Sequence, residues 1–484
     1  MKASEIYKYR NLFLLAGILT GIPLSFLIIS QNFVSALNIF FNIHLNVEFW
    51  GFGLQHFGIE ILFLCGVLLG ATFIPLEKKF LFFILSVIFL FFVFLLRYSV
   101  NIPITDDYFE ILSFSNSFYN SISPDEKISM FFSFNNENRI VVLRLIILIL
   151  QEISGVINFK ILIVFSGLGL PLILFLFNKT ICFEILRLEI ILILSIFVFH
   201  FGFYDSVLWL IPAMHYKILI LCLMFALFSL NMKSPYFQIL ALFFAVFSVF
   251  TCGNGWLVFY VAMANLVVKR NWKPLILWVV VGIGLAIPYF QGFPMVHKEI
   301  SFQLFVNSFL FSCCFLGSAF QFMYWLPIPF CFGLIIWLFF GFLTFKKYYK
   351  KNFPIYGLML FVLLSSLTAS HFRTIGDDLS VAISNRYGFF SLMVFSASLI
   401  ALFEIIKEES RKKLILPALI LSIAYHLLTG VFFFPEVPVR KQKLESFIRD
   451  IKNNNLVIPS PPAIPTGADN IVREAIRNKI YYPD

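Results

Sequence analysis

The chain has 484 residues, of which 60% are hydrophobic and only 13% are charged, and its mean hydropathy is +0.91. Soluble domains are about half apolar and about a quarter charged, so this composition excludes a water-soluble globular protein and predicts an all-α polytopic membrane protein. The formal net charge of +10 does not indicate a nucleic-acid partner, because the basic residues are dispersed over short loops between apolar segments.

Apolar segments of about 20 residues, the length that crosses a hydrocarbon core of about 30 Å, recur from one end of the chain to the other. We predict about thirteen transmembrane helices from these segments. They lie at 11–30, 52–74, 80–96, 158–177, 186–203, 217–230, 236–250, 256–268, 275–289, 326–345, 355–370, 387–406 and 414–434. Lys and Arg gather in alternate loops, which predicts that the N-terminus faces the cytoplasm and that the C-terminus lies outside.

The sequence divides into a multi-span region, 1–434, and a polar, Pro-rich C-terminal segment, 435–484. The longest polar stretch between spans is the loop 97–139, on the predicted outer side. Ser123 and Pro124 within this loop predict the start of a short helix, because serine caps helices and proline favours the first helical position.

Polar motifs fall in several loops on the same predicted side of the membrane. They are "ITDDYF" with Asp106, Asp107 and Tyr108, "NNENR" at 135–139, "YDSVLW" at 204–209, "CGNGW" at 252–256 and "HFRTIGDDLSVAISNRYG" at 371–388. Polar residues gathered at one membrane face predict a binding or catalytic site. A transporter or flippase would instead place ionisable residues inside the spans, which we expect to be nearly free of charge.

Asp106 and Asp107 follow directly after a predicted span. Two adjacent carboxylates in a low-dielectric cleft raise the pKa of one of them unless cations or hydrogen-bond donors hold both ionised. A carboxylate at a membrane boundary suits a general base that takes a proton from an attacking hydroxyl. The alternative is a structural turn, since aspartate also favours turns.

The order of these motifs is similar to that in a group of bacterial multi-span glycosyltransferases. They belong to the GT-C superfamily, which uses polyprenyl-phosphate sugars at the outer membrane face. Many members have histidines where this chain has Asn135 and Asn138, and the late motif matches at Arg373, Gly376, Ser384, Arg386 and Tyr387. The overall pattern also resembles the serotype-converting O-antigen glucosyltransferases.

This resemblance implies a GT-C-like protein of the bacterial inner membrane with a periplasmic active site. Its donor would be an undecaprenyl-phosphate-linked sugar, with glucose expected, and its acceptor an O-antigen or another lipid-linked glycan. The base would be Asp106 or Asp107, and guanidinium groups would stabilise the phosphate through paired N–H donors. The phosphate candidates are Arg386, Arg373 and Arg139, and the substrate-binding candidates are Tyr108, Glu137, Asn136, Asn254, Tyr387 and Trp209.

We expect no cofactor, although the "GDD" at 376–378 could join the first aspartate pair around a divalent cation. Hard cations usually need more oxygen ligands than these residues offer. Other functions stay open at this point. They are an O-antigen polymerase or ligase, a transporter or flippase of lipid-linked sugars, and a structural membrane subunit.

Overall fold

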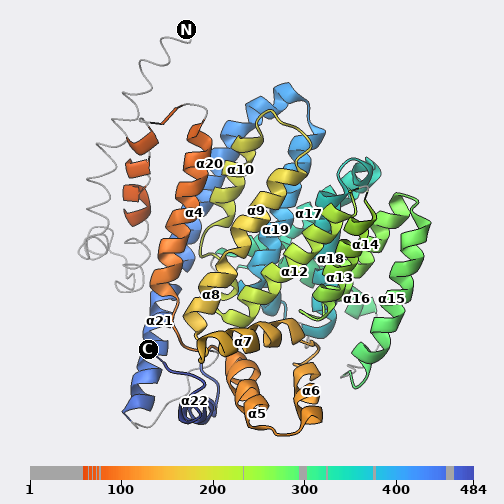
Figure 1. Cartoon of the computed structure of the whole chain (residues 1–484). Coiled ribbons are helices and arrows are strands. Elements are labelled where there is room, and N and C mark those ends of the chain that lie inside the picture. Colours follow the sequence, from red (N-terminus) through yellow and green to blue (C-terminus); the bar gives the residue numbers. More distant parts are fainter. Residues whose placement is uncertain are drawn as a thin grey trace. The chain divides into compact units, whose positions relative to one another are not determined.

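The structure is a computed structural model that describes residues 58–63, 65–67, 69–71, 74–75, 78–232, 234–293, 302–322, 325–373, 378–453 and 463–483. Within these ranges the regular structure is helical, apart from two isolated β-bridges (Figure 1). The prediction of an all-α protein is therefore confirmed for this part of the chain. The predicted span 11–30 and part of the span 52–74 lie outside the described residues.

Eight helical segments in the described ranges are long and apolar enough to cross a membrane. They contain α4 (Lys79–Tyr98), α8 (Phe159–Gly167) continued by α9 (Gly169–Thr180), α12 (Leu210–Ser229), α15 (Trp272–Phe290), α17 (Pro327–Phe345), α18 (Phe353–Arg373), α19 (Gly388–Ile405) and α20 (Glu408–Phe433). The number of membrane-length helices in the described residues is thus lower than the predicted number of about thirteen spans.

The difference arises mainly from helices shorter than the expected spans. At 1.5 Å per residue, α13 (Pro235–Val249) and α14 (Gly255–Val268) extend for only about 21–23 Å, less than a hydrocarbon core. The predicted span 186–203 contains α10 (Arg187–Val198), which has 12 residues. A further apolar helix, α16 (Phe302–Leu316), was not predicted, because polar side chains such as Gln303 and Asn307 interrupt its apolar run.

One compact unit combines Met1–Tyr98, Phe183–Gly202 and Lys407–Gln442. In it α10 packs between α4 and α20. The Phe91 ring meets Phe199 edge to face and stacks on Phe201. His426 on α20 is joined through Nε2 to Glu60 Oε1 at 3.0 Å.

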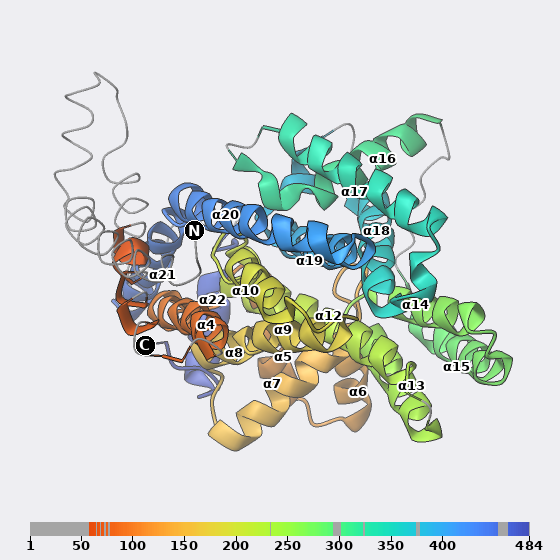
Figure 2. The ribbon, with the colours of Figure 1, turned by 90° about the horizontal axis from the view of Figure 1, so that it is seen from above.

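The second unit combines Ser99–Cys182, Phe203–Ile406 and Lys443–Asp484. Its central helix is α12, which contacts α8, α9, α13, α14 and α18 and is apolar on every side, as expected of a helix surrounded by others. In Figure 2, α16 and α17 lie side by side, and α18 packs on both α16 and α19.

Lys217 corrects the expectation that the spans are nearly free of charge. Since α12 begins at Leu210 rather than at 217, this lysine lies inside the helix and is buried. Its ammonium donates to the carbonyl oxygens of Ser206 at 2.8 Å and Ala213 at 3.0 Å. Backbone acceptors therefore compensate the buried charge.

Three short helices follow the aspartate doublet: the π-helix η2 (Tyr108–Ser113), α5 (Phe114–Asn120) and α6 (Pro124–Phe132). As predicted, Ser123 caps α6, with its hydroxyl accepting from Glu126 N at 3.5 Å and Pro124 in the first turn. The amphipathic α7 (Val141–Ser154) comes next. Its buried Arg144 donates to carbonyls at the end of α6 and to Glu110 Oε2 at 2.8 Å. The loop 97–139 is therefore largely helical, and Arg144 joins two of its segments through hydrogen bonds.

The C-terminal segment forms α21 (Glu436–Lys452) and α22 (Ala468–Arg477). α22 packs against η2, and the segment around it is hydrogen-bonded to the start of the second unit. Asn101 Nδ2 donates to the Tyr482 carbonyl at 2.8 Å, and Thr105 N donates to the Ala463 carbonyl at 2.9 Å. These contacts hold the backbone that carries the aspartate doublet.

Candidate functional site

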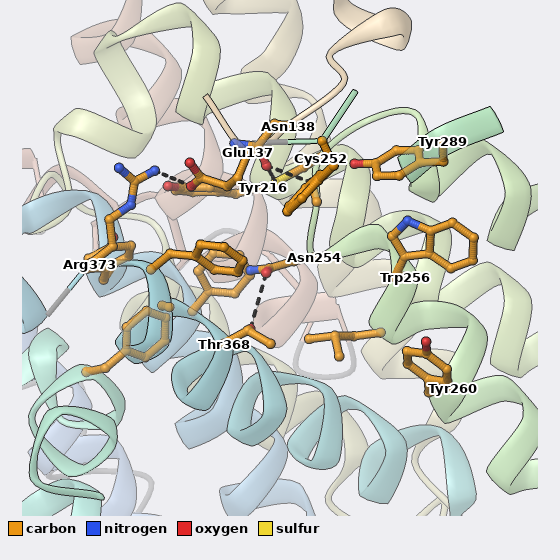
Figure 3. A pocket seen from close by; sticks show the side chains of 18 of the residues that line it. Glu137, Asn138, Tyr216, Cys252, Asn254, Trp256, Tyr260, Tyr289, Thr368 and Arg373 are labelled. Atoms are coloured by element: carbon orange, nitrogen blue, oxygen red, sulfur yellow. Dashed lines mark hydrogen bonds and ion pairs between the residues drawn. The ribbon is translucent and has the colours of Figure 1, made fainter. Parts of the chain in front are cut away.

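A pocket of about 350 Å³ lies in the second unit and takes lining residues from three of the predicted outer motifs, 135–139, 252–256 and 371–388 (Figure 3). It is lined by Glu137, Asn138, Tyr216, Cys252, Gly253, Asn254, Trp256, Leu257, Tyr260, Tyr289, Phe290, Phe293, Phe315, Thr368, Ala369, Phe372, Arg373, Tyr387 and Phe390. The structure thus brings Glu137, Asn254, Arg373 and Tyr387 together, as the sequence motifs predicted. The membrane side on which the pocket lies stays a prediction.

The polar end of the pocket is built around an ion pair between Arg373, at the end of α18, and Glu137. Both side chains are only partly exposed, at 34% and 21%, so the pair is accessible to a ligand. In Figure 3 the guanidinium and the carboxylate point toward each other at one end of the pocket. A guanidinium held in this way keeps N–H donors available for an anion.

Asn138 connects the first loop to the "GNG" turn. Its Oδ1 accepts a hydrogen bond from Gly253 N at 2.7 Å. Gly255 is required on steric grounds, because a Cβ there would lie 1.9 Å from the Ser248 carbonyl oxygen. Asn254 faces the pocket, and its Oδ1 accepts from the Thr368 hydroxyl at 3.4 Å (Figure 3). A side chain of the 135–139 motif therefore holds the turn of the 252–256 motif, although the two are more than a hundred residues apart in the sequence.

The opposite end of the pocket is aromatic. Trp256 stacks on Phe290 with ring centroids 5.5 Å apart and meets Tyr289 edge to face at 5.4 Å. The Trp256 Nε1 is buried and finds no hydrogen-bond partner in the described part of the chain. A buried donor without a partner is costly, so its presence on a pocket wall suggests a ligand that supplies an acceptor.

Asp107 is enclosed by its own loop and by the start of α12. It is 1% exposed, and its carboxyl oxygens accept from Ile211 N at 3.3 Å, in the first turn of α12, and from Ile104 N at 3.2 Å. Burial raises the pKa of Asp107 to about 8, against the effect of these backbone donors. The carboxyl therefore joins the loop to the N-terminus of α12.

Asp106 occupies a different environment, although it is the neighbouring residue. It is half-buried, and burial raises its pKa, while the charges of Arg386 and Arg373 act in the opposite direction. The Asp106 carboxyl thus lies within the electrostatic range of two guanidinium groups, although it is not among the lining residues of the pocket. Of the two candidate bases, Asp106 is the one whose carboxyl is partly exposed and lies in the field of two arginines.

Arg386 follows Asn385 in a short turn that is hydrogen-bonded to the loop 204–209. Asp205 N donates to Asn385 Oδ1 at 3.0 Å, and the Ser206 hydroxyl donates to the Arg386 carbonyl at 2.6 Å. The Arg386 Nε is buried and has no hydrogen-bond partner within the described ranges. Arg386 does not line the pocket, but it lies beside Tyr387, which does.

Arg139 is placed differently from the prediction that it binds phosphate. Its guanidinium donates to carbonyls near the end of α15, to Tyr289 O at 2.9 Å and Gln291 O at 2.8 Å, and also to Phe132 O. The guanidinium lies 3.9 Å from the Phe134 ring centroid. Arg139 does not line the pocket, and it satisfies carbonyls that a helix end leaves without partners.

We expect Arg139→Gln to destabilise the protein by about 1.5–3 kcal/mol, because several charge-assisted hydrogen bonds are lost. Thermal unfolding of the purified protein in detergent measures this change, with the exposed Arg449→Gln as a control. A large loss of affinity for the polyprenyl-phosphate sugar in Arg139→Gln, without a change in stability, would contradict the structural role.

Three predicted substrate-binding residues also lie away from the pocket. Tyr108 is fully buried and meets Phe447 edge to face, while Trp209 is 9% exposed at the start of α12. Asn136 has a φ of 50° in the turn between Asn135 and Asn138, and its side chain donates to Asn135 Oδ1. Sequence motifs locate a loop correctly but do not show which side chains point into the core.

Two residues of the possible cation site, Gly376 and Asp377, lie outside the described residues. Asp378 is described, and its Oδ1 accepts from Ser380 N at 2.8 Å. No group of three or more His, Cys, Asp or Glu side chains in the described ranges could hold a metal ion.

The site also contains residues that the prediction did not include. Tyr216 on α12, Tyr289 on α15 and Thr368 on α18 lie inside long apolar segments. A polar atom at an isolated position in such a segment was the only available signal. Trp256 belonged to the predicted motif "CGNGW", but aromatic residues at membrane interfaces are common without any ligand.

No family model matches the chain, and neither a curated protein nor a solved structure matches it. The fold of the described residues defines the class of this chain, a largely helical protein with several helices able to cross a membrane.

The pH dependence of stability tests the state of Asp107. The pKa of Asp107 is 3.8 in an ordinary environment and about 8 in the folded protein. At pH values between these two, the folded carboxyl keeps a proton that the unfolded chain has released. The unfolded state then binds fewer protons, so stability falls as the pH rises through this window. We expect the melting temperature of the wild type to fall relative to Asp107→Asn across this range. Parallel pH profiles for the two proteins would contradict a protonated Asp107.

Proposed function

We propose that the protein is an inverting glycosyltransferase of the bacterial inner membrane with its active site on the periplasmic side. It would transfer a sugar, with glucose as the first candidate, from undecaprenyl phosphate to a lipid-linked glycan such as an O-antigen. The orientation, with the N-terminus in the cytoplasm and the C-terminus in the periplasm, belongs to this proposal. So does the similarity to GT-C enzymes.

The observation that supports this function best is the division of one pocket into an ionic end and an aromatic end. Glu137 and Arg373 offer a charged pair at one end, and Trp256 offers an unpartnered donor on the aromatic wall at the other. A sugar joined through phosphate to an apolar chain needs both kinds of contact. The volume of about 350 Å³ falls within the range of small-ligand pockets, about 300–1,000 Å³.

In the proposed reaction an acceptor hydroxyl attacks the anomeric carbon of the donor sugar. Asp106 takes the hydroxyl proton as the new C–O bond forms. The bond from the anomeric carbon to the phosphate oxygen breaks, and polyprenyl phosphate leaves with the bonding electrons. Arg373 and Arg386 stabilise the charge that develops on the phosphate. One direct displacement inverts the configuration and needs no covalent enzyme intermediate.

The direct test uses the purified full chain in phospholipid vesicles with undecaprenyl-phosphate-linked glucose and a lipid-linked O-antigen repeat. We expect the product to carry one additional sugar, and lipopolysaccharide from cells with the gene to show the same side branch. A change in glycan chain length without a new branch indicates a polymerase or ligase. Movement of the donor across the vesicle membrane without transfer indicates a flippase. Either result would replace the proposed reaction.

A further inference from the structure

A second pocket, of about 420 Å³, lies at the other ends of helices that contribute to the first pocket. The first pocket uses Trp256 near the start of α14 and Thr368 near the end of α18, whereas the second uses Val268 and Phe353 at their opposite ends. The 21 residues of α18 extend for about 31 Å, close to the thickness of a hydrocarbon core. A membrane crossed by α18 would therefore separate the two pockets.

The second pocket has a strongly positive lining. Four lysines, Lys179, Lys269, Lys350 and Lys351, line it, and no aspartate or glutamate is among its described lining residues. Lys269 donates to Leu230 O at 2.7 Å and to Asn231 Oδ1 at 2.6 Å. An ammonium group has three donors, so these two contacts leave one donor of Lys269 for a ligand.

Glu404, a buried carboxylate behind this lining, is held by neutral hydrogen-bond donors rather than by a lysine ammonium. Glu404 on α19 accepts from Cys182 N at 2.9 Å, Tyr348 Oη at 2.8 Å and Asn352 Nδ2 at 3.0 Å. Lys351 contacts the Glu404 backbone carbonyl at 2.5 Å rather than the carboxylate. Burial also lowers the pKa of Lys269, so an anion bound beside it would favour its charged form.

Asn265 on α14 supplies an independent observation. Its side chain is fully buried and lines the second pocket, yet neither Oδ1 nor Nδ2 has a hydrogen-bond partner among the residues that the structure describes. Leaving both polar atoms of a buried amide without partners is expensive. A ligand that satisfies them must offer an acceptor to Nδ2 and a donor to Oδ1. A phosphate oxygen and a hydroxyl group in the same molecule meet this requirement.

We propose that this second pocket binds a phosphorylated polyol, with the phosphate among the lysines and a hydroxyl donating to Asn265. The group can reach the pocket from two sources, the glycerol-phosphate head group of phosphatidylglycerol or a soluble polyol phosphate. Lys179 and Lys350 are exposed at the rim, where a charged head group can enter. The site is independent of the sugar-transfer reaction proposed above.

The experiment uses the full chain in nanodiscs of phosphatidylcholine with and without phosphatidylglycerol. Native mass spectrometry counts the phosphatidylglycerol that stays bound, and titration with sn-glycerol 1-phosphate tests the soluble source. Asn265→Leu removes the amide at similar volume, and Lys350→Gln removes a rim charge without disturbing the core. The matched control is Lys273→Gln, an exposed lysine at the start of α15 that does not line the pocket.

We expect Asn265→Leu to bind the phosphorylated polyol about tenfold or more weakly, since it loses a hydrogen bond to a charged group. Lys350→Gln should bind more weakly than Lys273→Gln, which should match the wild type. Retention of phosphatidylglycerol identifies the lipid source, and binding of glycerol phosphate alone identifies the soluble source. If Asn265→Leu does not fold, as its melting curve would show, Lys350→Gln decides. Binding of neither compound, or equal binding by Lys350→Gln and Lys273→Gln, overturns the proposal.

Discussion

Asp106→Asn is expected to lower the turnover of sugar transfer by about 10²- to 10⁴-fold, the usual contribution of a positioned general base. The amide keeps the shape of the side chain but cannot accept the proton of the attacking hydroxyl. Arg386 and Arg373 already balance part of the cost of keeping Asp106 ionised, so the change removes a group that is placed to act as a base. Turnover with undecaprenyl-phosphate-linked glucose at saturating acceptor measures the effect.

The pH profile separates this catalytic role from a structural one. Burial raises the pKa of Asp106 above its ordinary value, and the base must be ionised to act. Wild-type activity should therefore decline on the acid side of a pKa higher than that of an exposed aspartate, and the residual activity of Asp106→Asn should lack this decline.

Two variants serve as controls for Asp106→Asn. Asp125→Asn alters an exposed carboxylate in the first turn of α6 and should keep wild-type turnover. Asp107→Asn changes the residue that contacts the N-terminus of α12, so its main effect should be on stability. Full turnover in Asp106→Asn together with loss of turnover in a folded Asp107→Asn would reverse the assignment of the base.

Arg373→Met is expected to reduce kcat/KM for the polyprenyl-phosphate donor by about 10- to 150-fold, which corresponds to a lost hydrogen bond to a charged group. Methionine keeps part of the aliphatic volume while it removes every N–H donor. Arg373→Lys should recover only part of the loss, because an ammonium cannot make the paired contact of a guanidinium with phosphate. Initial rates over a range of donor concentrations give this ratio.

Glu137→Gln is the matched variant for the other half of this ion pair. It keeps a side chain that can accept a hydrogen bond from Arg373 but removes the charge. If Arg373 acts on the donor phosphate, Glu137→Gln should change kcat/KM much less than Arg373→Met does. Equal losses in the two variants, accompanied by equal losses in melting temperature, would show that the pair only holds the loop in place.

The helical fold could be predicted because its signals are local. Long apolar runs placed α4, α17 and α18 close to their observed positions, and Ser123 with Pro124 correctly marked the start of α6. The error in α12, which begins seven residues before the predicted start, came from treating Lys217 as a span end. A buried lysine is tolerated there because backbone carbonyls accept from its ammonium, and a hydropathy pattern does not contain that information.

The sequence by itself determined that this is a helical membrane-type protein and that its polar motifs lie in a few loops. Composition and the length of apolar runs are properties of the linear chain and do not depend on contacts between distant residues. The tertiary structure decided which members of those motifs face one another. Asp107 and Arg139 turn toward helix ends, Asp106 lies near two arginines, and Arg373 meets a carboxylate from a loop more than two hundred residues away. These differences follow from long-range packing, which sets the burial and the partners of each charged group. Two residues that are adjacent in the chain can therefore have different surroundings.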